Sequence, residues 1–251
     1  MKRILISLGA FLLASVVAAA AFAGSFSDDQ KKEMEDIIHS YLMEHPDVLK
    51  EMVAKLDAAD KQAADEARGN VLSSASKDIF HNALDGVAGN PKGDVTVVEF
   101  MDYNCGWCHK SVTEMQAVIG KDKNVRLVLK EFPIFGEGSE YAARAAMASQ
   151  KQGKYWEFHQ AMFATKGKID AAVTDKVAQS VGLDITKLKA DMKDPEINAN
   201  IDKTQALAKS LQFTGTPGFI VGDKIFPGFT QQDNIIASIA ATRAEGGCKF
   251  C

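Results

Sequence analysis

The chain has 251 residues, with 29 Lys or Arg against 33 Asp or Glu and a formal net charge of −4. Without Lys2 and Arg3 the balance becomes 27 basic against 33 acidic residues, a net charge of −6. Such a chain indicates neither a nucleic-acid partner nor a polybasic membrane patch. Four cysteines are too few for a disulfide scaffold at this length, so we expect a hydrophobic core.

The first 23 residues have the pattern of a secretory signal peptide. Lys2 and Arg3 form a positive n-region, an apolar segment follows over 4–20, and Ala21-Phe22-Ala23 offers a cleavage site before Gly24. An uncleaved membrane anchor is the alternative. Because no Cys follows the site, a lipoprotein is not indicated. We therefore expect a periplasmic protein in a compartment where dithiols tend to be oxidised.

Residues 24–68 are predicted to form an amphipathic helical segment. Ser27 and Gln30 have capping-box spacing, and His45-Pro46 separates two apolar stripes. The stripes consist of Met34, Ile37, Ile38, Tyr41 and Leu42, then Val48, Leu49, Met52, Val53 and Leu56. Short helices cannot bury such faces alone, so they must dock on the main domain or self-associate through residues 26–68.

After a predicted linker at 69–92, residues 93–247 have the pattern of an α/β domain. Strand candidates at 95–100 and 125–132 flank a helical pattern at 110–119, which predicts a right-handed βαβ unit with parallel strands. The later elements are a helical insertion over 139–211, the turn Thr214-Gly215-Thr216-Pro217, a hairpin 219–226 through Gly222-Asp223, and a last helix capped by Thr230 and Asp233.

Cys105-Gly106-Trp107-Cys108 follows the first strand and lies where its helix should begin. Unpaired amides and the helix dipole at that end favour a thiolate, which suits reversible redox chemistry. A purely structural disulfide is one alternative. The following His109 completes C-x-x-C-H, the attachment motif for c-type haem, which is another.

A C-x-x-C after a strand in a βαβ pattern is typical of thioredoxin-like proteins. The order of strand, C-x-x-C helix, strand, helical insertion, Thr-Pro turn, hairpin and helix resembles the DsbA-like family of bacterial periplasmic thiol–disulfide oxidoreductases over about 93–245. The N-terminal segment resembles the oligomerisation regions of some members, including suppressor-of-copper-sensitivity proteins and dimeric DsbA-like isomerases. The resemblance implies a thioredoxin fold with a helical insertion.

Cys105, first on the helix, is the predicted nucleophile that forms a mixed disulfide, and the deeper Cys108 is the predicted resolving thiol. Glu99 interrupts an apolar strand, so burial should raise its pKa. The resemblance places an acidic residue there, near the resolving cysteine, where it could carry a proton to or from Cys108. The alternative is a carboxylate at a strand edge that reaches solvent. Lys130 is a candidate charge partner.

Thr216 and Pro217 are predicted substrate-binding residues, because the resemblance places a cis-proline loop there, facing the active site. A cis bond is plausible only before proline, and such a loop could add an extended substrate strand. An ordinary trans turn proline is the alternative. Thr216, together with Trp107 between the cysteines, looks closer to the disulfide isomerases than to strong oxidases.

Cys248-Lys249-Phe250-Cys251 forms a second C-x-x-C pair. A disulfide around so small a loop would contribute about 2 kcal/mol at most. An inconsequential disulfide, an accessory redox pair, and metal or intermolecular pairing all remain open. A zinc site shared with Cys105 and Cys108 does not fit the usual spacing.

The function we expect from these patterns is that of a periplasmic disulfide isomerase, with no metal or cofactor. The alternatives are a DsbA-type oxidase, a holdase chaperone and a c-type haem protein. The expected partners are unfolded or misoxidised secreted proteins, a membrane thiol–disulfide redox partner and further copies of the chain.

Overall fold

The computed structural model describes residues 26–251, which divide into two compact units between residues 62 and 63. The predicted signal peptide, 1–23, lies outside the described residues. Within the described part of the chain, no helix is both long and apolar enough to cross a membrane.

The first unit contains α2 (Asp28–Glu44) and the start of α3 (Pro46–Ser74). The predicted capping box is present, since the Gln30 amide donates to Ser27 Oγ at 3.2 Å and the Ser27 amide to Gln30 Oε1 at 3.0 Å. Helix α2 ends before His45, and α3 begins at Pro46, where a missing amide hydrogen costs nothing. The sequence pattern therefore located both the start of α2 and the break.

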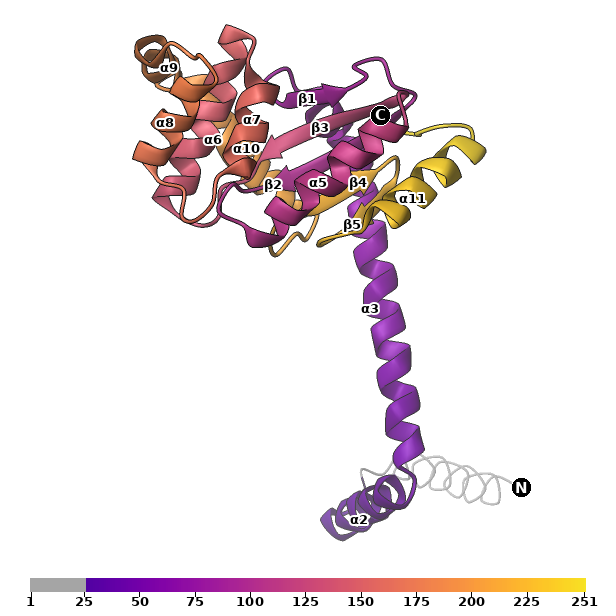
Figure 1. The fold of residues 1–251 in the computed structure, drawn as a ribbon. Coiled ribbons are helices and arrows are strands. Elements are labelled where there is room, and N and C mark those ends of the chain that lie inside the picture. Colours follow the sequence, from indigo (N-terminus) through magenta and orange to yellow (C-terminus); the bar gives the residue numbers. More distant parts are fainter. Residues whose placement is uncertain (1–25) are drawn as a thin grey trace, which may run out of the picture. The chain divides into compact units, whose positions relative to one another are not determined.

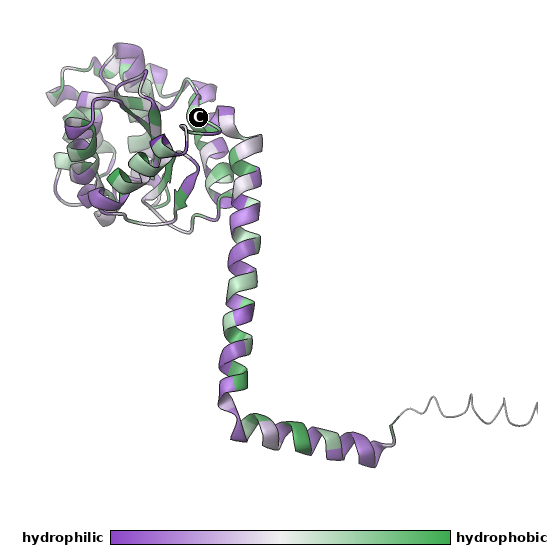
Figure 2. Ribbon diagram, turned by 90° about the vertical axis from the view of Figure 1, so that its right-hand side faces the viewer, coloured by the Kyte–Doolittle hydropathy of each residue, from purple (hydrophilic) through white to green (hydrophobic). Residues whose placement is uncertain are grey.

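The apolar stripes of this unit are exposed, and no residue of α2 is buried. Ile37 and Leu56 are both 61% exposed, and Figure 2 shows apolar positions in green along both helices. The exposed large side chains in this unit are those of Phe26, Ile37, Ile38, Tyr41, Leu42, Met43, Leu49, Met52, Val53 and Leu56. Amphipathic helices preceding the main domain are confirmed.

The second unit is built on a five-stranded sheet in the order β1-β3-β2-β4-β5 (Figure 1). The strands are β1 (Gly86–Gly89), β2 (Val95–Met101), β3 (Val125–Glu131), β4 (Gly218–Val221) and β5 (Lys224–Phe226). Strands β2 and β3 are parallel and are joined through α5 (Gly106–Lys121), as predicted. The predicted β4–β5 hairpin turns at Gly222, whose φ of +57° favours glycine.

Alternation along β2 divides the core between the two faces of the sheet. Val95, Val97 and Met101 belong to the apolar cluster that also contains residues of α5. Val98 and Phe100 belong to a second cluster on the other face. All seven residues of β2 are buried, so this strand is central and has no exposed edge.

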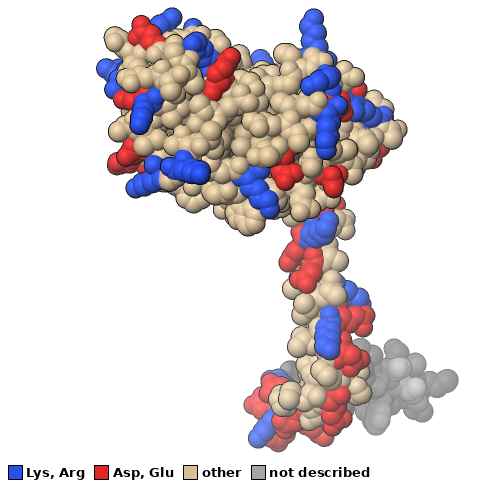
Figure 3. Space-filling view, viewed as in Figure 1, with Lys and Arg blue, Asp and Glu red and all other residues tan. Residues whose placement is uncertain are grey.

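The helical insertion lies beyond one end of the sheet (Figure 1). It comprises α6 (Glu137–Ser149), the 3₁₀ turn η1 (Gln150–Gln152), α7 (Tyr155–Ala164), α8 (Ala171–Ser180), α9 (Ile185–Asp191) and α10 (Pro195–Ser210). The predicted thioredoxin-like α/β fold with a helical insertion is confirmed. On the face shown in Figure 3, acidic and basic side chains are interspersed over this unit.

Two local expectations were wrong. Residues 69–92 do not form a plain linker, because they contain the end of α3, α4 (Ser76–Phe80) and β1, with Ile79 fully buried. The last helix, α11 (Gln232–Ala244), has Gln231 rather than Thr230 at its N-cap. The Thr230 hydroxyl instead donates to the Gly228 carbonyl at 3.2 Å, which removes it from the helix end.

Candidate redox site

The loop after β2 places Cys105 at the N-cap of α5. A buried carboxyl group, that of Asp102, shapes this loop by accepting hydrogen bonds from the Asn104 amide at 2.7 Å and the Ser139 hydroxyl at 2.7 Å. The Cys105 amide donates to the Asp102 carbonyl at 3.1 Å. The Cys105 sulfur therefore lies at the positive end of a 16-residue helix.

The surroundings of Cys105 stabilise its thiolate. The hydrogen bond from the Cys108 side chain is the largest of several contributions that lower the pKa of Cys105 to about 6, although burial opposes them. The Cys108 amide also donates to the sulfur, at 3.3 Å. When Cys105 is protonated, its thiol donates to the Thr216 carbonyl at 3.2 Å. Because Cys105 is only 3% exposed, a substrate must fit closely around the sulfur.

Cys108 is the opposite kind of thiol. It lies one turn into α5 and is fully buried. Burial, the hydrogen bond with Cys105 and the charge of Glu99 together raise the pKa of Cys108 far above its ordinary value. Cys108 therefore remains a protonated thiol until a base removes its proton.

Glu99 lies on the α5 face of central strand β2 and is 4% exposed, which rules out a carboxylate at a strand edge. Burial raises the pKa of Glu99 to about 8, the hydrogen bond from Ser111 opposes this, and the charge of Cys105 adds to it. The Ser111 hydroxyl donates to Glu99 Oε1 at 2.7 Å. Glu99 and Cys108 interact electrostatically and can each exist in two protonation states.

The predicted pairing of Glu99 with Lys130 is wrong. In the β2–β3 register Glu99 lies opposite Leu129, whereas Lys130 lies opposite Phe100. Side chains alternate along a strand, so Lys130 points to the other face of the sheet. There it forms a buried ion pair with Asp85 at 2.5 Å.

The Thr216–Pro217 peptide bond is cis, as predicted, and the Thr216 carbonyl lies next to the Cys105 sulfur. Trp107 is 56% exposed, and its ring lies 5.2 Å from that of Phe229. The Lys110 amine lies over both rings, at 5.4 Å from Trp107 and 4.8 Å from Phe229. Apolar surface and a positive charge therefore lie near Cys105, at the start of α5.

Sequence reasoning missed Ser111, Phe229 and Asp102. Ser111 and Phe229 are ordinary helix and loop residues whose importance depends on the strand and loop packed against them. The role of Asp102 could have been predicted from the sequence, because an Asp directly after a strand is typical of a turn in which the side chain accepts hydrogen bonds from nearby amides.

His109 is not free to ligate a haem iron in this conformation. Its Nδ1 lies 2.9 Å from the Phe163 carbonyl and its Nε2 lies 2.9 Å from the Tyr103 carbonyl. Among residues 26–251, no three or more His, Cys, Asp or Glu side chains are grouped so that they could hold a metal ion.

Comparison with known proteins places this site in a family. The model of the DSBA-like thioredoxin domain matches residues 96–240, more than half of the chain. The chain belongs to the DSBA-like thioredoxin domain family. A second family model, the copper resistance protein ScsC N-terminal domain, matches residues 30–63, so the DSBA-like domain here follows a ScsC-type segment.

Proteins similar to this chain match it over most of the DSBA-like domain. A thioredoxin-like oxidoreductase from Silicibacter pomeroyi DSS-3 is 45% identical, covers 67% of this chain and 97% of its own, and superposes with a TM-score of 0.66. Disulfide bond formation protein D of Bacillus subtilis (strain 168) is 26% identical over 165 residues, which are 61% of this chain and 74% of that protein. Proteus mirabilis ScsC, 22% identical, shares the fold over 88% of this chain and 98% of its own with a TM-score of 0.65.

Other curated relatives are much longer proteins. They include the Na(+)/H(+) antiporters NhaA of Salinispora tropica, Salinispora arenicola and Herminiimonas arsenicoxydans. The chain spans about a quarter of the length of each.

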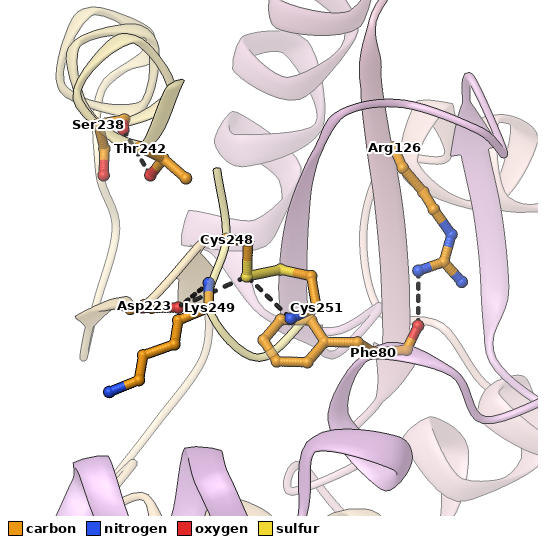
Figure 4. The surroundings of a disulfide bond; sticks show 8 residues. All are labelled: Phe80, Arg126, Asp223, Ser238, Thr242, Cys248, Lys249 and Cys251. Atoms are coloured by element: carbon orange, nitrogen blue, oxygen red, sulfur yellow. Dashed lines mark hydrogen bonds between the residues drawn. A yellow bond between two sulfur atoms is a disulfide. The ribbon is translucent and has the colours of Figure 1, made fainter. Parts of the chain in front are cut away.

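The second cysteine pair of this DSBA-like chain forms a disulfide, Cys248–Cys251 (Figure 4). It packs with Phe250 against the apolar cluster on the far side of the sheet from α5. Asp223 Oδ1 accepts a hydrogen bond from the Lys249 amide at 3.2 Å and holds the segment in place. The bond lies within one chain, as both an inconsequential disulfide and an accessory redox pair require.

Proposed function

We propose that the chain is a periplasmic thiol–disulfide oxidoreductase that acts as a disulfide isomerase. The observation that carries the proposal is the Cys105 sulfur at the start of α5, facing the Cys108 amide and the Thr216 carbonyl. With a pKa of about 6, Cys105 is mostly thiolate at neutral pH. A thiolate is the form that attacks disulfides.

In the first step the Cys105 thiolate attacks one sulfur of a substrate disulfide, and the other substrate sulfur leaves as a thiolate. The mixed disulfide then has two fates. The freed substrate thiolate can attack another substrate disulfide, and a substrate thiolate released there then attacks the mixed disulfide and expels the Cys105 thiolate. The substrate is thereby rearranged without net oxidation. Alternatively, Cys108 attacks Cys105 Sγ and releases a reduced substrate.

Glu99 is the proposed proton carrier for the attack of Cys108 on Cys105 Sγ. Cys108 must lose a proton to attack, and Glu99 is the buried carboxyl group that interacts with it. A pKa of about 8 lets Glu99 change protonation state near neutral pH. The Ser111 hydroxyl holds the Glu99 carboxyl group in position.

Substrate binding is assigned to the surface around Cys105. The Thr216–Pro217 loop offers backbone groups to an extended substrate segment, as in β-strand addition. Trp107 adds exposed aromatic surface beside it. Unfolded or misoxidised secreted proteins expose apolar, extended segments and fit this surface.

The N-terminal segment favours isomerase over oxidase. Its apolar side chains are largely exposed in the first unit, and its residues 30–63 match the ScsC N-terminal domain. Association through 26–68 would bring several Cys105 sites to one substrate and hinder docking of an oxidising membrane partner. An oxidase remains the second candidate, because one relative is named disulfide bond formation protein D.

Refolding of scrambled ribonuclease tests the activity. Wild-type protein with a reduced Cys105 should restore ribonuclease activity, and Cys105→Ser should abolish this. Suppression of aggregation by both proteins, with no refolding by either, would indicate a holdase chaperone instead. Oxidation of reduced ribonuclease without rearrangement of the scrambled form would indicate an oxidase.

Association is tested in the full chain with Ile38→Glu and Leu49→Glu together. These changes place charges on the two exposed apolar stripes, so sedimentation should show a monomer and ribonuclease refolding should fall. Ala58→Glu is the matched control, because position 58 is exposed and lies on the opposite side of α3 from Leu49. A wild-type monomer at micromolar concentration would refute association.

A further inference from the structure

The Cys248–Cys251 pair repeats one feature of the Cys105 site. The Cys251 amide lies 3.0 Å from Cys248 Sγ, just as the Cys108 amide lies 3.3 Å from Cys105 Sγ. In each pair the amide of the second cysteine points at the sulfur of the first. An amide in that position stabilises negative charge, so Cys248 is prepared to leave a disulfide as a thiolate.

The disulfide lies at the surface, in a small ring. Both cysteines are half-buried, and they line a cavity of about 260 Å³ together with His81 and Arg126. Only two residues separate them, so ring closure adds little loop-entropy stabilisation. Gly246 and Gly247, both with positive φ, lie between the end of α11 and the pair.

The pair cannot reach Cys105 of its own chain. Helix α5 has 16 residues and is therefore about 24 Å long, with Cys105 at its start. At its other end Asp122 pairs with Arg243, near the end of α11, at 2.6 Å. The 248–251 segment is bonded to Asp223, next to Gly222, whose amide donates to the Thr96 carbonyl at the start of β2, whereas Cys105 follows the other end of β2. Exchange between the two pairs must therefore occur between molecules.

We propose that Cys248–Cys251 is a second redox site, whose disulfide exchanges with the reduced Cys105–Cys108 pair of another copy of the chain. The Cys105 thiolate attacks Cys251 Sγ, the Cys248–Cys251 bond breaks, and Cys248 leaves as a thiolate and takes a proton from solvent. Cys108 then gives up its proton and attacks Cys105 Sγ, which releases Cys251 as a thiolate that is protonated in turn. One disulfide forms as another opens, so two electrons move between copies without an external oxidant.

A second copy is the partner that fits, because the step requires a thiolate nucleophile with a buried resolving thiol, and the chain contains one. This inference rests on the proposed function in one respect, the role of Cys105 as nucleophile. Association through residues 26–68 would raise the local concentration of one copy's 248–251 segment around another copy's Cys105.

The test mixes two full-length variants that each keep one pair. Cys248→Ser/Cys251→Ser, with its Cys105 pair reduced, is mixed with Cys105→Ser/Cys108→Ser, whose 248–251 pair is oxidised. Thiols are alkylated at intervals and assigned to each pair by peptide mass spectrometry. The reverse mixture, with the oxidation states exchanged, is run in parallel. We expect transfer in one direction at micromolar concentration to be faster than exchange with glutathione at the same thiol concentration, since uncatalysed rearrangement takes minutes to hours.

Reduction of insulin by the Cys248→Ser/Cys251→Ser variant serves as the internal control. If this variant reduces insulin but neither mixture exchanges disulfides faster than glutathione does, the proposal of a second redox site is overturned and the proposed function stands. If it does not reduce insulin, the assignment of Cys105 as nucleophile fails first.

Asp223→Asn tests which sulfur leaves. Asp223 Oδ1 lies 3.5 Å from Cys248 Sγ, and an Asn at this position can still accept the hydrogen bond from the Lys249 amide. Removal of the negative charge beside a leaving thiolate should speed transfer several-fold. An unchanged rate would overturn the assignment of Cys248 as the leaving sulfur.

Discussion

Replacement of Glu99 by Gln should make the protein more stable, and the gain should grow with pH. Glu99 is buried at 4% exposure, and burial raises its pKa from 4.5 to about 8. The folded protein therefore holds this proton at pH values where the unfolded chain has released it. A Gln side chain has nearly the same shape and can still accept the hydrogen bond from Ser111, but it cannot ionise.

The direction and size of this stability gain follow from the linkage between proton binding and folding. Between pH 4.5 and about 8 the folded state binds more protons than the unfolded state, so the stability of the wild type falls as pH rises. The difference of about 3.5 pH units, at 1.36 kcal/mol each, sets an upper bound of about 5 kcal/mol. Relaxation and water penetration around buried charges reduce such penalties, so we expect about 2–3 kcal/mol.

Urea denaturation at pH 4.5, 6.5 and 8.5 under reducing conditions measures this difference. Glu99→Gln and wild type should have similar free energies of unfolding at pH 4.5 and should diverge by about 2–3 kcal/mol at pH 8.5. Glu157→Gln, at an exposed position, is the matched control and should show no divergence. A difference that does not change with pH would refute the assignment of Glu99 as a buried acid with a raised pKa.

Three further predictions concern the thiols, a buried ion pair and the substrate surface. Cys108→Ala should raise the pKa of Cys105 by about one unit, because it removes the largest stabilising hydrogen bond, while Cys108→Ser should raise it less. The rate of iodoacetamide labelling of Cys105 is measured against pH in each variant. Equal midpoints of these pH curves in wild type and Cys108→Ala would contradict the prediction. Asp85→Asn should lower the free energy of unfolding by about 3 kcal/mol in urea denaturation, since it leaves Lys130 buried without its charge partner. A decrease below about 1 kcal/mol would show that the ion pair is not needed for stability. Trp107→Ala should raise KM for an unfolded protein substrate about five-fold while iodoacetamide labelling of Cys105 stays unchanged, and slower labelling would instead indicate a disturbed thiolate.

The parts of the fold that could be predicted were those with local signals. The capping box at Ser27, the buried strand before Cys105 and the two-residue turn at Gly222 each depend on residues a few positions apart. Strand β1 gave no such signal, because Gly86–Gly89 is short and half glycine. It forms because β3 offers it an antiparallel partner.

The parts that could not be predicted depend on register and on distant partners. Lys130 was a candidate charge partner for Glu99, whereas in the structure its charge partner is a different carboxylate. Choosing Glu99 as that partner required knowing which residues face each other across β2 and β3, and one position decides the face. The true partner, Asp85, lies 45 residues earlier in a stretch expected to be a linker.

Asp102 has a consequence for how this domain tolerates substitution. Its one carboxyl group accepts hydrogen bonds from the turn before Cys105, from the Ile134 amide at 2.7 Å and from Ser139 at the start of α6. The turn before Cys105 and the first helix of the insertion are thereby held by the same carboxyl group. Substitutions elsewhere in α7–α10 can therefore change the outer helices while the spacing between the Cys105 turn and the start of α6 stays constant.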